Sequence, residues 1–111
     1  MTRIRLAFIA LVVGACQSGH SGPAAGYTDD IDRICRQQEL SGALNQPESE
    51  RALSSAYWLE RHLATPEGRK FSATIFPLAP AAKADRLAAE AARVGLPACP
   101  TADAWRGGGK P

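Results

Sequence analysis

Prolines and glycines divide the chain between residues 28 and 97 into four segments. The positions of these helix-breaking residues limit the fold more than any other feature. The interruptions fall at Gly42, Pro47, Pro66, Pro77, Pro80, Gly95 and Pro97. Proline is tolerated in the first turn of a helix but prevents its continuation, and glycine commonly follows a helix end. Apolar residues recur every three or four positions within the segments, as in amphipathic helices. We therefore predict an all-α fold, a small four-helix bundle-like domain.

The four helices are predicted at about 29–41, from the Asn45–Gln46–Pro47–Glu48 start to Leu63, at 66–76 and at 80–94. Thr28, Asn45 and Thr65 have side chains suited to capping the first three. Gly95 is placed to end the fourth in a Schellman motif. The spacing predicts inward faces made of Ile31, Ile34, Cys35 and Gln38; Ala52, Leu53, Ala56, Tyr57, Leu59 and Leu63; Phe71, Thr74 and Ile75; and Ala84, Leu87, Ala88, Ala91 and Val94.

Residues 1–15 have the pattern of a secretory signal peptide. Arg3 and Arg5 precede an uncharged stretch, Leu6–Ala15, which has ten residues. A bilayer-spanning helix needs about 20 apolar residues, so this stretch is too short to be a permanent anchor. We expect cleavage at its end.

Val13-Gly14-Ala15-Cys16 resembles the lipobox of bacterial lipoproteins. The resemblance implies that Cys16 becomes the first residue and carries a diacylglyceryl thioether, with fatty-acyl chains such as palmitate holding the protein on a membrane. Gln17 stands where lipoproteins of the inner membrane often have Asp, which favours the outer membrane, facing the periplasm. The alternative is ordinary cleavage after Ala15, which would leave a free thiol in a soluble protein.

The chain has three cysteines. If Cys16 carries lipid, as the lipobox resemblance implies, Cys35 and Cys99 remain as an even pair in an oxidising compartment. We predict that they form a disulfide. A redox or metal-binding pair is the alternative, but the C-x-x-C spacing and a histidine near either cysteine in sequence are missing.

The predicted organisation is a signal peptide at 1–15, lipidated Cys16 with a flexible tether at 16–27, a helical domain at 28–105, and a disordered tail at 106–111. The tether is rich in Gly, Ser and Pro and has no periodic apolar face. His20 lies in it without a partner in sequence and is interpreted as a solvated residue.

Charge and motifs exclude several function classes. The chain has 13 basic and 11 acidic residues, and removal of Arg3 and Arg5 with the leader leaves equal numbers. A surplus of positive charge, the usual footprint of a nucleic-acid binder, is therefore missing from the mature chain. No catalytic triad, metal-ligand pattern or cofactor fingerprint stands out, so we expect no enzyme, metal or cofactor. His62 is predicted to cap carbonyls at the end of its helix.

The adjacent aromatic residues Tyr57 and Trp58 have two interpretations. Each ring buries much surface, which favours packing in or beside the core. The alternative is that the pair lines a contact site for a ligand or partner.

Two runs, Trp58-Leu59-Glu60 and Thr65-Pro66-Glu67-Gly68-Arg69, together with Phe71 and the cysteines Cys35 and Cys99, resemble small uncharacterised secreted proteins of the myxobacterial type. The resemblance extends over roughly residues 30–105. It supports the fold and the compartment, and it implies no catalytic residue.

The expected function is that of a non-catalytic interaction or structural module on the bacterial envelope, bound to the membrane by lipid and to an envelope protein partner. The alternatives are a small-ligand carrier with a cavity beneath Tyr57, Trp58, Phe71 and Phe76, and, ranked last, a small redox or hydrolytic enzyme. A pocket above roughly 300 Å³ near these aromatic residues would favour the carrier, and a filled core the interaction module.

Overall fold

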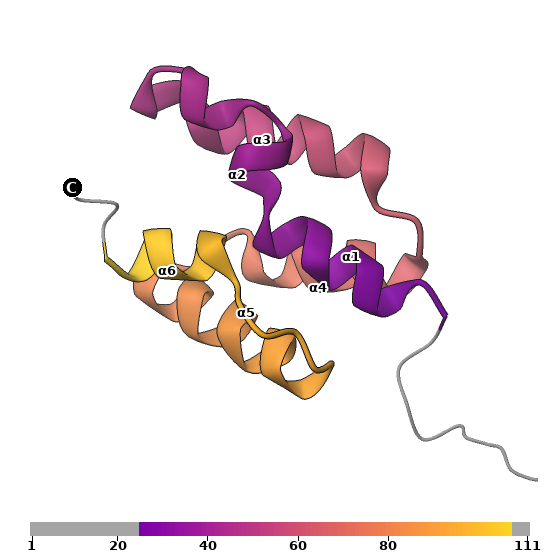
Figure 1. Cartoon of the computed structure of the whole chain (residues 1–111). Coiled ribbons are helices and arrows are strands. Elements are labelled where there is room, and N and C mark those ends of the chain that lie inside the picture. The colour runs from indigo at the N-terminus through magenta and orange to yellow at the C-terminus, as the bar shows by residue number, and fades with distance from the viewer. Residues whose placement is uncertain (1–24, 108–111) are drawn as a thin grey trace, which may run out of the picture.

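The computed structural model describes residues 25–107, and these fold into helices joined by short connections (Figure 1). The predicted leader, the predicted lipidation site Cys16, most of the predicted tether and the last four residues lie outside them. In order, the elements are α1 (Tyr27–Cys35), α2 (Gln37–Leu40), the 3₁₀ turn η2 (Ala43–Asn45), α3 (Glu48–His62), α4 (Pro66–Ile75), α5 (Pro80–Arg93) and α6 (Pro100–Arg106). The predicted all-α class is confirmed.

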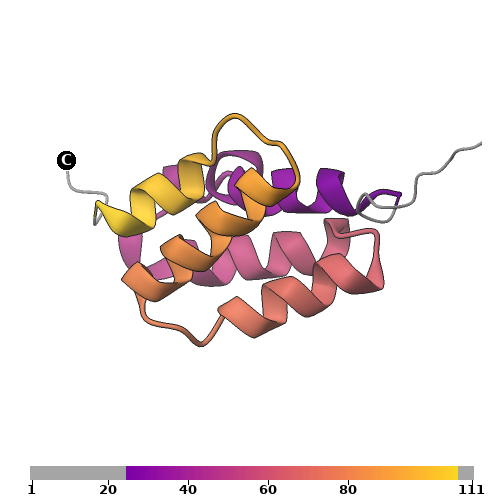
Figure 2. The same cartoon turned by 90° about the horizontal axis from the view of Figure 1, so that it is seen from below.

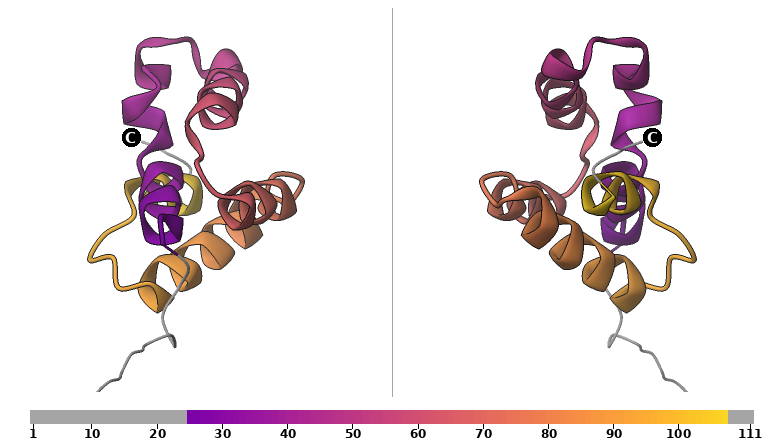
Figure 3. Two further views of the ribbon diagram at one scale, coloured as in Figure 1. Left: turned by 90° about the vertical axis from the view of Figure 1, so that its right-hand side faces the viewer. Right: turned by 90° about the vertical axis from the view of Figure 1, so that its left-hand side faces the viewer.

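The helices form two levels, and one further helix, α5, crosses beneath them. α2 and α3 stand above a level that contains α1, α4 and α6, and α5 runs diagonally below it (Figures 1 and 3). Seen from below, α5 runs diagonally across the front of the molecule, and α6 lies beside it (Figure 2). α5 packs on α6, α1 and α4, while α3 packs on η2, α2 and α1.

One apolar core joins these levels. Its fully buried aliphatic centre is formed by Ile31, Ile34 and Leu87. Around them lie further buried residues and partly buried side chains from every helix of the lower level. Burial of this apolar surface makes the largest favourable contribution to the free energy of folding. Members of the core are Tyr27, Cys35, Leu59, Leu63, Ile75, Ala84, Ala91, Cys99 and Ala102, with Trp58, Phe71, Leu78, Ala88, Val94, Leu96 and Trp105 packed against them.

The predicted disulfide is present. Cys35 at the end of α1 bonds to Cys99, the residue before α6, across 64 positions of sequence, with the two Cα atoms 4.6 Å apart. Cys35 is fully buried. The bond therefore fixes the end of α1 against the start of the last helix.

The first predicted helix is interrupted. It was expected to continue to Ser41, but α1 ends at Cys35, and Arg36 leaves the helical region with φ −118° and ψ 17°. The side-chain amide of Gln37 donates to the Ile34 carbonyl at 2.9 Å, so one carbonyl at this helix end keeps a partner. The break lets α1 stay in the lower level while α2 rises to meet α3.

Two predicted caps and one predicted boundary are wrong. Gly26, with φ 87°, is the N-cap of α1 in place of Thr28, and Pro47 is the N-cap of α3 in place of Asn45. Tyr27, expected in the tether, begins α1 and is buried in the core. Burial of its large apolar ring stabilises a helix that begins at Tyr27 rather than at Asp29.

The other predicted ends are confirmed. The Thr65 hydroxyl accepts from the Gly68 N–H at 2.9 Å and caps α4. At the end of α5, Gly95 has φ 88°, and the N–H groups of Gly95 and Leu96 donate to the carbonyls of Ala92 and Ala91. These two bonds define a Schellman motif.

The predicted inner face of α3 is only partly buried. Leu59 and Leu63 are buried, whereas Leu53 and Tyr57 are more than half exposed. The α3 residues that belong to the core or pack against it, Trp58 and Leu59, lie in the C-terminal half of the helix, and Leu63 follows its end. Helix α6 was not predicted from the sequence.

Candidate functional site

A half-open groove lies between α3 and α4 and extends to the start of α5 and to α6. Its volume is about 1150 Å³, which is slightly above the roughly 300–1,000 Å³ typical of small-molecule sites. The structure thus leaves a concave surface where the upper level meets the lower one. This groove is the candidate functional site.

The floor of the groove is apolar and its two long walls are built from small residues. Ile34, Leu59, Leu63 and Ile75 form the floor, and all four are at least 94% buried. The walls carry Ala52, Ser55 and Ala56 from α3, and Ser72 and Ala73 from α4. Because these side chains are short, α3 and α4 leave space between them.

A cation lies at the end of the groove formed by α5 and α6. The Lys83 ammonium is 4.9 Å from the centre of the Trp105 ring and 5.4 Å from that of Phe76, and all three residues line the groove. Both distances are within the range of a cation–π contact. Partial burial lowers the pKa of Lys83, and no carboxylate among residues 25–107 forms an ion pair with it.

The other charged residues of the groove are of mixed sign. They are Glu48, Arg51, Glu60 and Arg69. The Arg51 side chain already donates to the Gln46 carbonyl at 3.1 Å. Lys83 is therefore the lining cation that is both partly buried and without a carboxylate or carbonyl partner in the described part of the chain.

A buried hydroxyl also lines the groove without a partner. Ser55 on α3 is 3% exposed, and its Oγ makes no hydrogen bond within residues 25–107. A buried donor without an acceptor costs about 1–3 kcal/mol.

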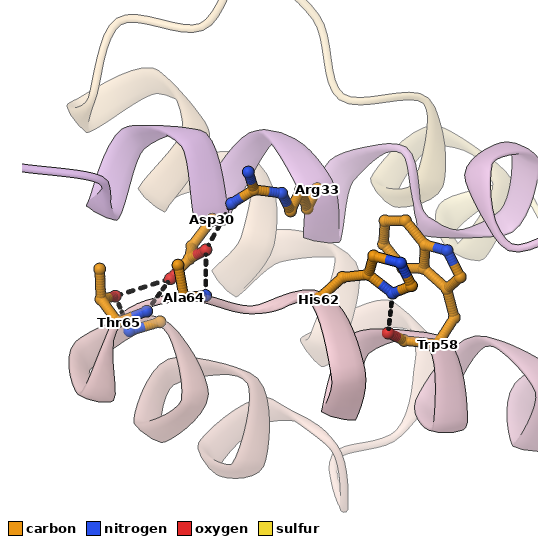
Figure 4. Close-up of polar contacts among 7 residues, drawn as sticks. Asp30, Arg33, Trp58, His62, Ala64 and Thr65 are labelled. Atoms are coloured by element: carbon orange, nitrogen blue, oxygen red, sulfur yellow. Dashed lines mark hydrogen bonds and ion pairs between the residues drawn. The ribbon is translucent and has the colours of Figure 1, made fainter.

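Neither of the predicted contact residues lines this groove. Trp58 packs against the core and stacks on His62, with ring centres 4.2 Å apart, while Tyr57 faces solvent on another side of α3. The His62 Nδ1 lies 2.7 Å from the Trp58 carbonyl, as predicted for a helix-end cap (Figure 4). Of the four aromatic residues expected around a cavity, Phe76 is among the lining residues.

Three residues that distinguish the groove, Lys83, Trp105 and Ser55, were not among the site residues predicted from the sequence. The sequence carries one usable signal for Trp105: Pro100 followed by Asp103 favours a short helix start, which would have placed the ring.

Asp30 forms the most connected polar cluster, and its role is structural. Its fully buried carboxylate accepts from the backbone N–H groups of Ala64 and Thr65 at 2.9 and 2.8 Å, from the Thr65 hydroxyl at 2.6 Å, and from Arg33 at 2.8 Å (Figure 4). Burial alone would raise the pKa of Asp30, but these hydrogen bonds to the ionised form hold it below its usual value. The carboxylate ties α1 to the connection between α3 and α4.

A second polar cluster, formed by Tyr27, Glu90 and Arg93, joins α1 to α5. The buried Tyr27 hydroxyl donates to Glu90 at 2.5 Å, and Arg93 pairs with the same carboxylate. Burial, and then the bond to Glu90, raises the pKa of Tyr27 to about 12. Arg93 and Tyr27 in turn lower the pKa of Glu90. Each of these groups already has its partner, so the cluster offers no open position for a ligand.

Within residues 25–107, no three His, Cys, Asp or Glu side chains are arranged to hold a metal ion. Across the same residues, every helix is too short or too polar to span a bilayer. The arrangement in the groove is suited to binding, because it combines apolar surface, an unpaired cation and an unpaired hydroxyl.

Comparison with known proteins returned no matching family model, no similar curated protein and no similar solved structure.

Proposed function

We propose that this chain is a lipid-anchored protein of the bacterial cell envelope that acts as a non-catalytic interaction module and binds its partner or ligand in the groove between α3 and α4. The observation that carries the proposal is the groove itself, a concavity of about 1150 Å³ with a buried apolar floor. Its envelope location rests on the leader and the Val13-Gly14-Ala15-Cys16 motif.

The two functions weighed from the sequence are each supported by part of the geometry. The disulfide-linked core is filled by side chains, which supports the interaction module. The groove exceeds the roughly 300 Å³ that favours a small-ligand carrier. However, Phe76 alone of the four expected aromatic residues lines it.

The anchor is tested by following lipid on Cys16. In cells fed labelled palmitate, we expect label on the wild-type chain and none on Cys16→Ser, which should also move from the membrane to the soluble fraction. The reason is that Cys16 supplies the thioether sulfur, and two or three acyl chains give stable membrane binding. The Cys35→Ala/Cys99→Ala double variant, which keeps Cys16, should stay labelled. Labelled Cys16→Ser protein would contradict the anchor.

The groove is tested by photocrosslinking in the native envelope. A photoreactive residue in place of Ala73, an exposed wall residue of α4, should capture an envelope component. The matched control is Ala89, an exposed alanine on α5 outside the groove. Equal capture from both positions, or none from Ala73, would show that the groove is not the binding surface.

A further inference from the structure

We propose that the groove binds a single-chain anionic amphiphile, whose hydrocarbon tail lies on the apolar floor and whose carboxylate or phosphate head lies beside Lys83. This inference rests on the proposed function of the groove as the binding surface, and it names the chemistry of the occupant.

The shape of the groove suits one extended chain. The floor residues are already buried, so the apolar surface that a hydrocarbon chain can cover comes mainly from exposed lining residues, namely Leu44, Ala52 and Phe76. Phe76, which lines the groove, remains 58% exposed. Apolar surface that is accessible in a concave site gains by being covered with hydrocarbon.

Charge selects the head group. Lys83 is partly buried between the Phe76 and Trp105 rings and has no carboxylate partner in the described chain. Burial without a counter-ion disfavours its charged form, as the lowered pKa of Lys83 indicates. An anionic head would supply the missing counter-charge, whereas a cationic head would be repelled. The two acidic residues of the groove, Glu48 and Glu60, are outnumbered by Arg51, Arg69 and Lys83.

Ser55 is the independent observation that points to a ligand. Its buried Oγ lacks a hydrogen-bond partner and belongs to the lining of the groove. Buried polar groups in native proteins are nearly always paired with protein, water or ligand. Rotation of the Ser55 side chain towards the groove would let an oxygen atom of the amphiphile accept its proton.

The test uses the mature chain carrying Cys16→Ser, so that no covalent lipid competes for the groove. Binding is followed through tryptophan fluorescence, because Trp105 borders the site. The probes share a palmitoyl or hexadecyl chain and differ in the head: palmitate and palmitoyl lysophosphatidate are anionic, monopalmitin is neutral, and hexadecyltrimethylammonium is cationic. All are used below the concentration at which they form micelles.

We expect the wild-type groove to bind at least one anionic probe about tenfold more tightly than monopalmitin, since a charge-assisted contact is worth about that factor. Comparison of palmitate with lysophosphatidate then identifies carboxylate or phosphate as the preferred head. Lys83→Met should abolish the preference, and Lys83→Glu should transfer it to the cationic probe. Lys70→Met, at an exposed α4 lysine outside the groove, should leave it unchanged. Retained helical circular dichroism shows that each variant is folded.

A groove-filling variant locates the tail. Ala73→Trp should weaken binding of every probe at least tenfold, while Ala89→Trp should have no effect. Equal affinities for all heads, a preference unchanged in both Lys83 variants, or binding unchanged by Ala73→Trp would overturn the inference. If Ala73 captures a protein in the envelope while no amphiphile binds, this inference fails and the proposed function stands. If Ala73 captures nothing and no probe binds, both fail.

Discussion

Reduction of the Cys35–Cys99 disulfide is expected to lower the free energy of unfolding by about 4 kcal/mol, because the bond closes a loop of 64 positions and so restricts the unfolded chain. A domain of roughly 80 residues has a total stability of about 4–12 kcal/mol. The disulfide therefore accounts for a third or more of it. We expect the reduced protein to unfold at much lower urea concentration.

The measurement is urea unfolding of the Cys16→Ser chain with and without reductant, with the redox state established by a mass difference of two hydrogens. The Cys35→Ala/Cys99→Ala variant should behave like the reduced protein, apart from a small additional loss from the missing buried sulfurs. Adding reductant to this double variant is the control and should change nothing. A midpoint that stays constant after complete reduction would contradict the expected contribution.

Removal of the Asp30 carboxylate is expected to be the second large loss. Asp30→Ala should lower the free energy of unfolding by about 3 kcal/mol, because it leaves the N–H groups of Ala64 and Thr65 and the Thr65 hydroxyl without their acceptor. Asp29, in the same first turn but exposed, provides the matched control. Asp29→Ala should cost far less, since it loses only a favourable position near the helix N-terminus.

The same carboxylate makes stability depend on pH. The folded state holds the pKa of Asp30 below its usual 3.8, so the unfolded chain binds the proton more readily. The contribution is complete above about pH 4, near the unfolded pKa, and is lost as the pH falls through the folded pKa. Asp30→Asn should flatten the fall in unfolding free energy between pH 4 and pH 2 relative to Asp29→Asn. A residual slope remains because the pKa of Glu90 is also lowered.

Gly68 provides a check that the Asp30 contact is responsible. A Cβ atom at this buried position would overlap the Asp30 carboxylate, with the Asp30 Cγ 2.7 Å away, so Gly68→Ala should cost about 2 kcal/mol through overpacking. In an Asp30→Ala background the cost should shrink, because most of the side chain in the way has been removed. Additive losses in this double-mutant cycle would mean that the two residues do not interact.

Local rules accounted for much of the fold. Proline at the first position of α4 and α5, Thr65 as a cap and Gly95 in a Schellman motif all act through neighbours in sequence, so their consequences could be predicted directly. The disulfide followed from counting cysteines. By contrast, the break at Arg36 and the burial of Tyr27 depend on helices distant in sequence, namely α3 and α5.

The acidic residues near the start of α1 illustrate the same limit. From the sequence, Asp29, Asp30 and Asp32 were equivalent, since each places negative charge near a helix N-terminus. The fold distinguishes them, because Asp30 alone of the three is buried against the connection before α4. Helical periodicity places a residue on a face but does not reveal which loop that face will meet.

The sequence by itself determined the helical class, the ends of α4 and α5 and the pairing of the two cysteines, because these depend on backbone preferences and on composition. Only the tertiary structure decided the groove, the position of Lys83 between two rings and the unpaired hydroxyl of Ser55. These features arise where α3, α4, α5 and α6 come together. A space between helices is a property of their packing, and no single segment of sequence encodes it.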